Sequence, residues 1–182
     1  SDTTTIIVNA LPVVTLAPFA DVCIDDPAFA ISGGNPTGGV YSGTGVVGAN
    51  YNPAVGGVGT HNIIYYYTDG NGCINSATQP ITVHPVPTPV NVMGGGSYCS
   101  GGAGVTVSLD GSQTNVNYEL YLNGSPTANI VSGTGASIGF GPQTAAGSYT
   151  VVATNVLTGC TNNMTGSVGV TIFTLPNASA GP

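Results

Sequence analysis

The sequence predicts an all-β protein, and three observations support this prediction. Short runs of Val, Ile, Thr and Tyr alternate with polar residues, which is typical of strands with one buried face. Glycine and proline, 29 and 13 of the 182 residues, interrupt these runs at short intervals. The chain also repeats itself along its length, and no stretch shows sustained helical periodicity.

The strand pattern is clearest in three runs: Val105–Leu109, Tyr149–Ala153 and Val168–Ile172. Another run, Tyr118–Leu122, precedes Asn123-Gly124, a dipeptide that favours a tight hairpin turn. A second hairpin turn is expected at Asp69–Gly72. Several short strands within about 80 residues are the pattern of an immunoglobulin-like β-sandwich. We therefore expect two such sandwich domains in tandem and essentially no helix.

A strand that runs into a proline occurs three times, and these copies reveal the internal duplication. They are Ile6–Pro12, Ile81–Pro87 and Val170–Pro176. Inside the repeats, Ser-Gly-Thr-Gly occurs at residues 42–45 and again at 132–135. The second repeat is longer between its first cysteine and this element. Because Tyr118–Gly124 falls in the extra length, we expect an added strand and turn there.

The copies divide the chain into one repeat at residues 12–87 and another at 88–176. Residues 1–11 are expected to be the last strand of a preceding repeat, and residues 177–182 the start of the next one. An orphan strand exposes unpaired backbone groups, which favours pairing with another chain. A terminus without fixed structure is the alternative. The residues expected to pair with a neighbouring repeat are Thr5, Ile6, Ile7 and Val8.

Each expected repeat holds two of the four cysteines. Four cysteines allow three connectivities, and the duplication favours one bridge per repeat, Cys23–Cys73 and Cys99–Cys160. A bridge that closes a loop of this length stabilises by roughly 4 kcal/mol in the chain-entropy model, and it implies an oxidising compartment. A metal site is the rival interpretation, but the close ligand spacing that such sites use is missing.

The charge of the chain excludes several classes of function. There is no lysine or arginine, and seven acidic residues give a formal charge of −7. Binding to nucleic acid and to anionic membrane surfaces needs basic side chains, and no apolar run is long enough for a membrane helix. We expect neither nucleic acid nor membrane insertion for this segment. The chain also has no trypsin site, through drift or through selection for protease resistance.

The remaining polar residues indicate no catalytic site, so we expect no enzyme, no cofactor and no metal. The two histidines, His61 and His84, are not spaced as a triad. Glu119 is the only glutamate, and a glycosidase needs two positioned carboxylates. Asp69–Gly72 resembles the start of a calcium loop without the closing bidentate acid, so a hairpin turn is favoured. Asp25-Asp26 is expected to be a solvated turn.

Alternation along a strand places Tyr65 and Tyr67 on one face and Tyr66 on the other. One of these faces is expected to belong to the core. The other face offers an aromatic surface on which a sugar could stack, and this is one basis for considering a glycan as a partner.

Motifs in both halves resemble the immunoglobulin-like or PKD-like repeats of very large Bacteroidetes surface proteins. In the first half these motifs are Gly33–Val46 and Tyr67–Cys73, and in the second they are Tyr98–Gly101, Tyr149–Val151 and Thr158–Thr161. Such proteins include long adhesins, among them the large gliding-motility adhesin of flavobacteria. The resemblance implies a secreted protein, exported by the type IX system and held at the cell surface. It implies no catalytic residues.

The sequence therefore predicts a structural repeat segment of an extracellular adhesin or filament. Pro85, Pro87 and Pro89 restrict the linker, so the segment is expected to act as a semi-rigid, protease-resistant spacer whose partners are neighbouring repeats or copies. The alternative is a module that binds a surface glycan through the loops Gly33–Gly45 and Asn123–Gly135. Asp2-Thr3-Thr4 resembles the O-glycosylation site of Bacteroidetes, which makes Thr3 a candidate for modification.

Overall fold

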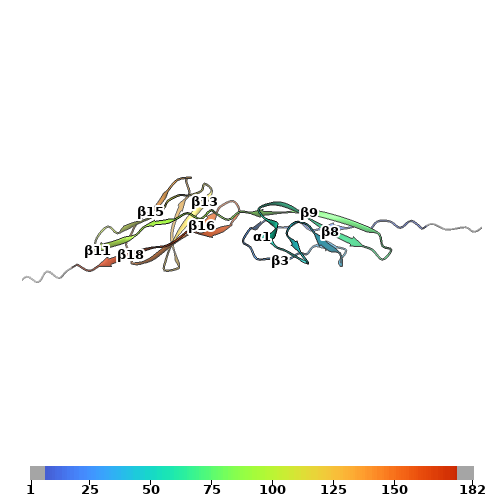
Figure 1. The fold of residues 1–182 in the computed structure, drawn as a ribbon, viewed down its shortest axis with the longest axis horizontal. Helices are drawn as coiled ribbons and strands as arrows, with labels where there is room; N and C mark the ends of the chain where they lie inside the picture. Colours follow the sequence, from blue (N-terminus) through green and yellow to red (C-terminus); the bar gives the residue numbers. More distant parts are fainter. Residues whose placement is uncertain (1–6, 176–182) are drawn as a thin grey trace, which may run out of the picture. The chain divides into compact units, whose positions relative to one another are not determined.

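The computed structural model describes residues 7–175, and the chain separates into two compact units, Ser1–Pro85 and Val86–Pro182. Each unit consists of strands joined by loops, with the first unit drawn in blue to green and the second in green to red (Figure 1). Each unit has a hydrophobic core of its own, formed by residues from both of its sheet layers. Two layers packed around one core are the architecture of a β-sandwich.

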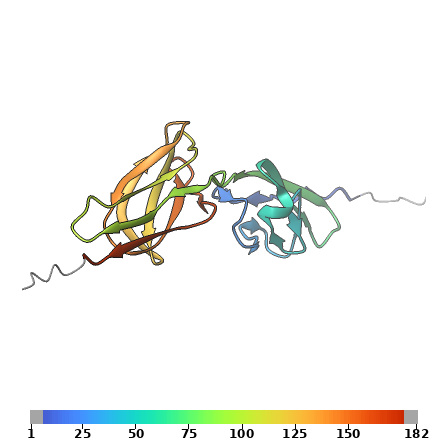
Figure 2. The same cartoon turned by 60° about the vertical axis from the view of Figure 1, so that its left-hand side comes forward.

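The first unit places a four-stranded sheet on one side of its core. Its order is β2 (Val22–Cys23), β9 (Ile74–His84), β8 (Gly59–Thr68) and β5 (Val40–Ser42). The other side has a three-stranded sheet of β3 (Phe29–Ala30), β7 (Asn50–Tyr51) and β6 (Val46–Val47), and a strand pair of β1 (Thr15–Leu16) and β4 (Gly34–Asn35). The single helix among the described residues, α1 (Pro53–Gly56), has four residues and lies in this unit (Figure 2).

The long hairpin β8–β9 is the main element of the first unit, because its inward side chains supply most of the core. Ile63 and Tyr65 of β8 are buried, whereas Tyr66 between the two tyrosines is exposed. Tyr67 is half-buried and packs against the same core, so the predicted alternation of the three tyrosines is confirmed. From the other side of the sandwich, Leu16 and Tyr51 pack onto this face.

The second unit is a larger sandwich. One sheet has the order β11 (Gly96–Cys99), β18 (Val168–Phe173), β16 (Gly147–Asn155), β13 (Val116–Leu122) and β14 (Ser125–Ser132), with β17 (Thr161–Asn163) also paired to β16. The other sheet consists of β10 (Val92–Gly94), β12 (Val105–Leu109) and β15 (Ile138–Gln143). Alternate residues of the central strands form the core; these are Val116, Tyr118 and Leu120 of β13 and Tyr149, Val151 and Ala153 of β16.

The all-β, immunoglobulin-like fold class predicted from the sequence is confirmed. The three runs with the clearest alternation coincide with β12, β16 and β18. The predicted hairpin turn also forms: Asn123 and Gly124 join β13 to β14, and their φ angles are 49° and 81°. Two successive positive φ angles are what a type I′ turn requires, and Asn-Gly tolerates them best.

The expected extra strand of the second repeat is β13, and it changes where the duplicated Ser-Gly-Thr-Gly segment lies. In the first unit this segment follows β5, which pairs directly with β8. In the second unit it follows β14, which pairs with β13, and β13 in turn pairs with β16. The two copies of the motif therefore lie at different places in their sheets. In the first unit β5 lies directly beside β8, whereas in the second unit the added strand β13 lies between β14 and β16.

The proposed orphan strand lies only partly within the described residues. Thr5 and Ile6 fall outside them, as does Thr3, the candidate for modification. Ile7 and Val8 are described, belong to no strand, and are 78% and 88% exposed. Pairing of this segment with a second chain stays a prediction. Among residues 7–175, no helix combines the length and the apolar character that crossing a membrane requires.

Candidate functional site

The cysteines occupy two kinds of position, and the first is the end of a short strand. Cys23 ends β2, which runs parallel to β9 and places Cys23 opposite His84. Cys99 ends β11, which runs parallel to β18 and places Cys99 opposite Phe173. In both units the cysteine thus lies beside the end of the last long strand. We call Cys23 and Cys99 the strand-end cysteines.

The other two cysteines lie in the turn that follows the penultimate long strand of each unit. Cys73 and Cys160 each follow a glycine with positive φ, 83° and 77° respectively. The carbonyl oxygen of Cys73 accepts a hydrogen bond from the Asp69 N–H at 3.0 Å, and that of Cys160 accepts one from the Asn155 N–H at 2.9 Å. The two turns are thus closed by the same backbone contact. We call Cys73 and Cys160 the turn cysteines.

The predicted pairing of the cysteines is wrong. Cys23 and Cys160 are disulfide-bonded, whereas the thiols of Cys73 and Cys99 are free. The bridges Cys23–Cys73 and Cys99–Cys160 are therefore not formed. Cys99 is exposed and Cys73 is half-buried.

Strand geometry explains why a bridge within one unit cannot form. Cys23 lies opposite His84, the last residue of β9, whereas Cys73 immediately precedes Ile74, the first residue of this 11-residue strand. At about 3.3 Å per residue along an extended strand, the two cysteines are roughly 35 Å apart. A disulfide requires Cα atoms within about 7 Å of each other.

The second unit repeats this separation. Cys99 lies at the end of β18, and β18 pairs with the beginning of β16, where Val170 is opposite Gly147. Cys160 is hydrogen-bonded to Asn155, at the opposite end of the nine-residue strand β16. The strand-end and turn cysteines of one unit therefore lie at opposite ends of its sheet, too far apart to be bonded.

One asparagine in each unit fixes the start of that unit, and neither was among the residues predicted to be functional. The Asn75 side chain donates a hydrogen bond to the Pro12 carbonyl oxygen at 2.8 Å, and the Asn162 side chain donates one to the Pro87 carbonyl oxygen at 2.8 Å. Each asparagine is the second residue after a turn cysteine, and each proline ends one copy of the duplicated strand. This shared Cys-x-Asn spacing is the signal that could have revealed the contact.

The segment at the start of the second unit is held by two further hydrogen bonds. The Thr88 N–H donates to the Gln113 side-chain oxygen at 2.7 Å. The Thr165 N–H donates to the Val90 carbonyl oxygen at 2.8 Å. Although residues 87–90 form no strand, their backbone is therefore attached to the second unit.

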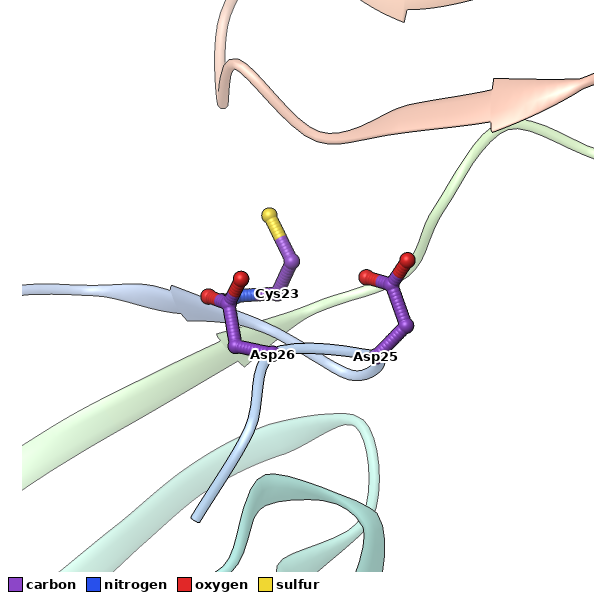
Figure 3. Close-up of side chains that lie close together, drawn as sticks. All are labelled: Cys23, Asp25 and Asp26. Carbon is purple, nitrogen blue, oxygen red and sulfur yellow. The ribbon is translucent and has the colours of Figure 1, made fainter. Parts of the chain in front are cut away.

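Figure 3 shows the group that most resembles a metal site, with the carboxylates of Asp25 and Asp26 beside Cys23. One ligand atom from each residue lies within 4.8 Å of the others. The Cys23 sulfur is part of a disulfide and is no thiolate ligand. The Asp26 carboxylate accepts a hydrogen bond from the Cys23 N–H at 2.7 Å, and the Asp26 N–H donates to the Cys23 carbonyl oxygen at 3.1 Å. These contacts are those of an exposed turn, and calcium takes six to eight oxygens.

The segment that resembles a calcium loop is the hairpin turn between β8 and β9, as predicted. One oxygen of the Asp69 carboxylate accepts hydrogen bonds from the N–H groups of Asn71 and Cys73, at 2.8 and 2.9 Å. The Gly72 N–H donates to the Asp69 carbonyl oxygen at 3.0 Å. An aspartate that bonds to the backbone in this way stabilises a turn locally.

The histidines are likewise held by local contacts. His61 shares a hydrogen bond of 2.8 Å with the Gly57 carbonyl oxygen. His84 lies 3.0 Å from the Asp21 carboxylate, which is itself exposed. Neither contact supplies a nucleophile together with a base, which a catalytic triad requires.

A hollow of about 240 Å³ lies on the first unit, beside the loop Gly33–Gly45 that was predicted to bind a glycan. Its lining combines glycine backbone with the side chains of Ile31, Ser32, Thr37, Tyr41 and Tyr65. The rings of Tyr41 and Tyr65 contact each other, with centroids 4.8 Å apart and planes tilted by 42°. An aromatic wall with hydroxyl groups at its rim is suited to a small polar ligand such as a sugar.

Hydrogen bonds from the tyrosine hydroxyls hold the glycine loop onto this wall. The Tyr65 hydroxyl donates to the Pro36 carbonyl oxygen at 2.6 Å and accepts from the Gly39 N–H at 2.7 Å. A Cβ atom added to Gly34 would lie 2.6 Å from the Tyr65 ring, so only glycine allows this close approach. The Tyr65 hydroxyl is thus occupied within the fold, and a ligand would meet mainly the exposed hydroxyls of Ser32 and Thr37.

Comparison with known proteins identifies no family. No family model matches the chain, and no curated protein matches it. Among solved structures, the chain is similar to murine CEACAM1b, with 15% identity and a TM-score of 0.40 over 88% of this chain and 98% of that one. It is also similar to a Ca²⁺-stabilised adhesin that helps an Antarctic bacterium bind ice, with 15% identity and a TM-score of 0.44 over 91% and 50%.

Titin domains I67–I69 show 11% identity and a TM-score of 0.41 over 88% of this chain and 64% of that one. TM-scores below 0.5 are too low to support any conclusion about function. The immunoglobulin-like assignment therefore rests on the sheet order, the strand pairing and the two cores.

Proposed function

We propose that this chain is a structural repeat segment of an extracellular surface adhesin or filament, in which it acts as a semi-rigid, protease-resistant spacer. The observation that carries the proposal is that the acidic side chains Asp26 and Asp69 and both asparagines, Asn75 and Asn162, bond to the chain's own backbone. The two aspartates stabilise turns, and the two asparagines hold the segments at the start of each unit.

The two asparagine contacts support the semi-rigid character in particular. In a tandem array, freedom between modules depends on how many linker residues are unattached. Residues 87–90 are hydrogen-bonded to the second unit through Pro87, Thr88 and Val90. Together with the restricted φ angles of the prolines, these contacts leave little linker free to act as a hinge.

The resistance to proteases has two physical sources. Enzymes that cut after lysine or arginine find no site in the 182 residues. Enzymes of other specificity require an extended, accessible backbone. Much of the backbone is hydrogen-bonded in sheets and turns and is therefore not accessible to them. The parent protein is, on this proposal, a secreted surface protein of the Bacteroidetes of the kind that serves gliding motility. A glycan attached at Thr3 would add a mass that intact-mass measurement of native material detects.

Electron microscopy of native, undenatured material tests the spacer function, with the mass of the dissociated chain measured alongside. We expect extended threads or fibres of regular width. A collapsed, freely jointed chain would contradict the proposal. A thread made of one very long polypeptide indicates a covalent array, and an ordered fibre that dissociates into short chains indicates a polymer of subunits.

Strand donation through residues 1–11 is a further part of the proposal, and its support is the copy of the strand sequence at Ile6–Pro12. In the polymer case, deletion of residues 1–11 should abolish fibres while both units stay folded. Fibres that assemble unchanged after the deletion would exclude strand donation.

Glycan binding is the second candidate function, because the hollow lined by Tyr41 and Tyr65 coincides with the predicted binding loop. A glycan array is the first test, and saturable binding is the expected result. Replacing the rim hydroxyls in Thr37→Val and Ser32→Ala should then weaken binding without loss of stability, since both residues are exposed. Substitutions in the second unit serve as the control. If they weaken glycan binding as much as Thr37→Val and Ser32→Ala do, the binding site does not lie in this hollow.

A further inference from the structure

The hollow on the first unit has no charged side chain in its lining. Every lining residue belongs to the first unit, and each is aliphatic, aromatic, hydroxyl-bearing or glycine. The seven acidic residues of the chain are absent from the lining, and the chain has no lysine or arginine. A charged ligand would leave water here without gaining an ion partner, which costs free energy. The lining therefore favours an uncharged ligand.

Three hydroxyl groups of the lining have hydrogen-bonding capacity that the fold does not use. Ser32 and Thr37 are exposed, and their hydroxyls bond to no group within residues 7–175. The Tyr41 hydroxyl accepts a hydrogen bond from the Gly34 N–H at 3.0 Å, and its own proton has no acceptor in the described part of the chain. Because a tyrosine hydroxyl both accepts and donates, Tyr41 retains one donor for a ligand.

The shape of the hollow is fixed before a ligand binds. The Tyr65 hydroxyl bonds to Pro36 and Gly39 and so holds the glycine loop against the sheet. A Cβ atom on Gly39 would clash with the Tyr66 carbonyl oxygen and with the Tyr65 ring, so the loop can lie this close only with glycine there. A site that is already formed avoids the free-energy cost of ordering a loop on binding.

An uncharged pyranose sugar combines the properties that this lining requires. Each sugar hydroxyl donates and accepts hydrogen bonds, as the hydroxyls of the lining do, and the C–H groups of the sugar ring can contact an aromatic side chain. The hollow measures about 240 Å³, whereas pockets for drug-sized ligands measure about 300–1,000 Å³. Its size therefore suits one sugar unit.

We propose that the hollow binds a single uncharged pyranose unit of a glycan, and that the Tyr41 hydroxyl donates a hydrogen bond to one of its oxygens. Tyr41 thereby determines which sugar hydroxyl is recognised, whereas Tyr65 is a positioning residue that holds the loop. The inference rests on glycan binding, the second candidate function, and adds the class of sugar and the residue that recognises it. Glycans whose bound unit carries a carboxylate or a sulfate are excluded.

An NMR titration of the full, isotope-labelled chain tests the class of sugar. The probes are methyl glycosides of neutral hexoses and, for each, the uronic acid that differs only by a carboxylate at C6. We expect saturable shifts of the Ser32, Gly38 and Gly39 amides with at least one neutral hexose, and at least tenfold weaker binding of the matching uronic acid. Equal binding of the uronic acid, or shifts confined to the second unit, would overturn the inference.

Deoxy sugars combined with Tyr41→Phe test the hydrogen bond. The unaltered chain should bind one deoxy form of the sugar about threefold to tenfold more weakly, as the loss of one neutral hydrogen bond implies. Tyr41→Phe should bind the parent sugar more weakly by the same factor, but that deoxy sugar no more weakly than the unaltered chain does. This non-additivity is what a double-mutant cycle measures. Equal losses for every deoxy sugar would show that the variant only loosens the loop, and would exclude the hydrogen bond.

Tyr67→Phe is the matched control, because Tyr67 is a half-buried tyrosine of the same unit that does not line the hollow. It should leave the affinity for the sugar unchanged, and an equal loss from this variant would exclude a specific part for Tyr41.

A glycan array separates the inference from the candidate function on which it rests. If acidic glycans alone bind, and binding depends on Ser32 and Thr37, the hollow binds glycans but the inference is wrong. If no glycan binds, both the inference and the candidate function fail. The spacer function is unaffected by either result, because electron microscopy tests it independently.

Discussion

Tyr51 carries a hydroxyl group that is buried in the first unit without a hydrogen-bond partner among the described residues. Its side chain is 1% exposed, and burial raises the pKa of this phenol above its ordinary value. The neutral form is thus favoured in the native state. The stability linked to this preference is complete below the unfolded-state pKa, about 10, and is lost as the pH rises above it.

Replacement of Tyr51 by phenylalanine is expected to leave the free energy of unfolding unchanged or to raise it by up to about 1 kcal/mol, because it removes an unsatisfied polar group. Chemical denaturation, with the disulfide intact, measures the difference. Tyr65→Phe is the matched control in the same unit, because its hydroxyl makes two backbone hydrogen bonds. The control should destabilise by about 1–3 kcal/mol. A comparable loss from Tyr51→Phe would show that its hydroxyl has a partner.

The hydrogen bonds between Asn91 and the Asp110 carboxylate are expected to make the stability of the second unit depend on pH in the acid range. The side-chain amide of Asn91 donates to one carboxylate oxygen at 2.6 Å, and the Asn91 backbone N–H donates to the other at 2.8 Å. These bonds, the side-chain bond first, lower the pKa of Asp110 below its ordinary value. A depressed native pKa stabilises the fold above the unfolded-state pKa, and this contribution is lost as the pH falls through the native pKa.

The expected result is a difference in stability between the unaltered chain and Asp110→Ala that is constant near neutral pH and shrinks below about pH 4. Denaturation at a series of pH values measures this difference, and NMR titration of the carboxyl group reports the pKa directly. A difference that does not change down to pH 2 would mean that the Asn91 contact does not stabilise the ionised carboxylate.

At the scale of elements, the contact between each asparagine and a linker proline has the most direct consequence for the spacer function. In the second unit the side chain of Asn162, the middle residue of β17, donates this hydrogen bond to the Pro87 carbonyl oxygen. The equivalent contact of the first unit, from Asn75 to Pro12, has the same length of 2.8 Å. Each unit therefore holds the segment at its start by the side chain of an asparagine that lies two residues after its turn cysteine.

Replacement of Asn162 by alanine should release the segment at residues 87–90. We expect faster hydrogen exchange of the Thr88 amide and a loss of stability of about 1 kcal/mol, the usual net value of one hydrogen bond. Asn163→Ala, at the next residue of β17, is the matched control and should leave the exchange of Thr88 unchanged. Equal exchange in both variants would show that the Asn162 contact does not restrain the linker.

At the scale of the whole molecule, the pairing of the cysteines decides which thiols are available. The structure has free thiols at the exposed Cys99 and the half-buried Cys73. One bridge inside each repeat would instead leave none. Alkylation of the native, unreduced chain should add two labels, with Cys99 modified faster than Cys73. A chain that takes up no label, measured as intact mass, would restore the pairing expected from the duplication.

Some features of the structure were predictable from the sequence, and others were not. The strands at 105–109, 149–153 and 168–172 and the Asn123-Gly124 turn were predictable because alternation and turn chemistry are local properties. The added strand at Tyr118–Leu122 was predictable from the length difference between repeats. Its insertion between β14 and β16 was not, since strand order in a sheet depends on pairing between distant residues.

The sequence by itself determined the all-β class, the duplication and the lack of positive charge, because each follows from composition or from patterns of a few residues. Only the tertiary structure decided which cysteines bond and where each linker is held. These depend on which ends of the strands lie together. Strand direction and register place Cys23 and Cys73 at opposite ends of β9, and equal spacing in two repeats carries no information about that distance.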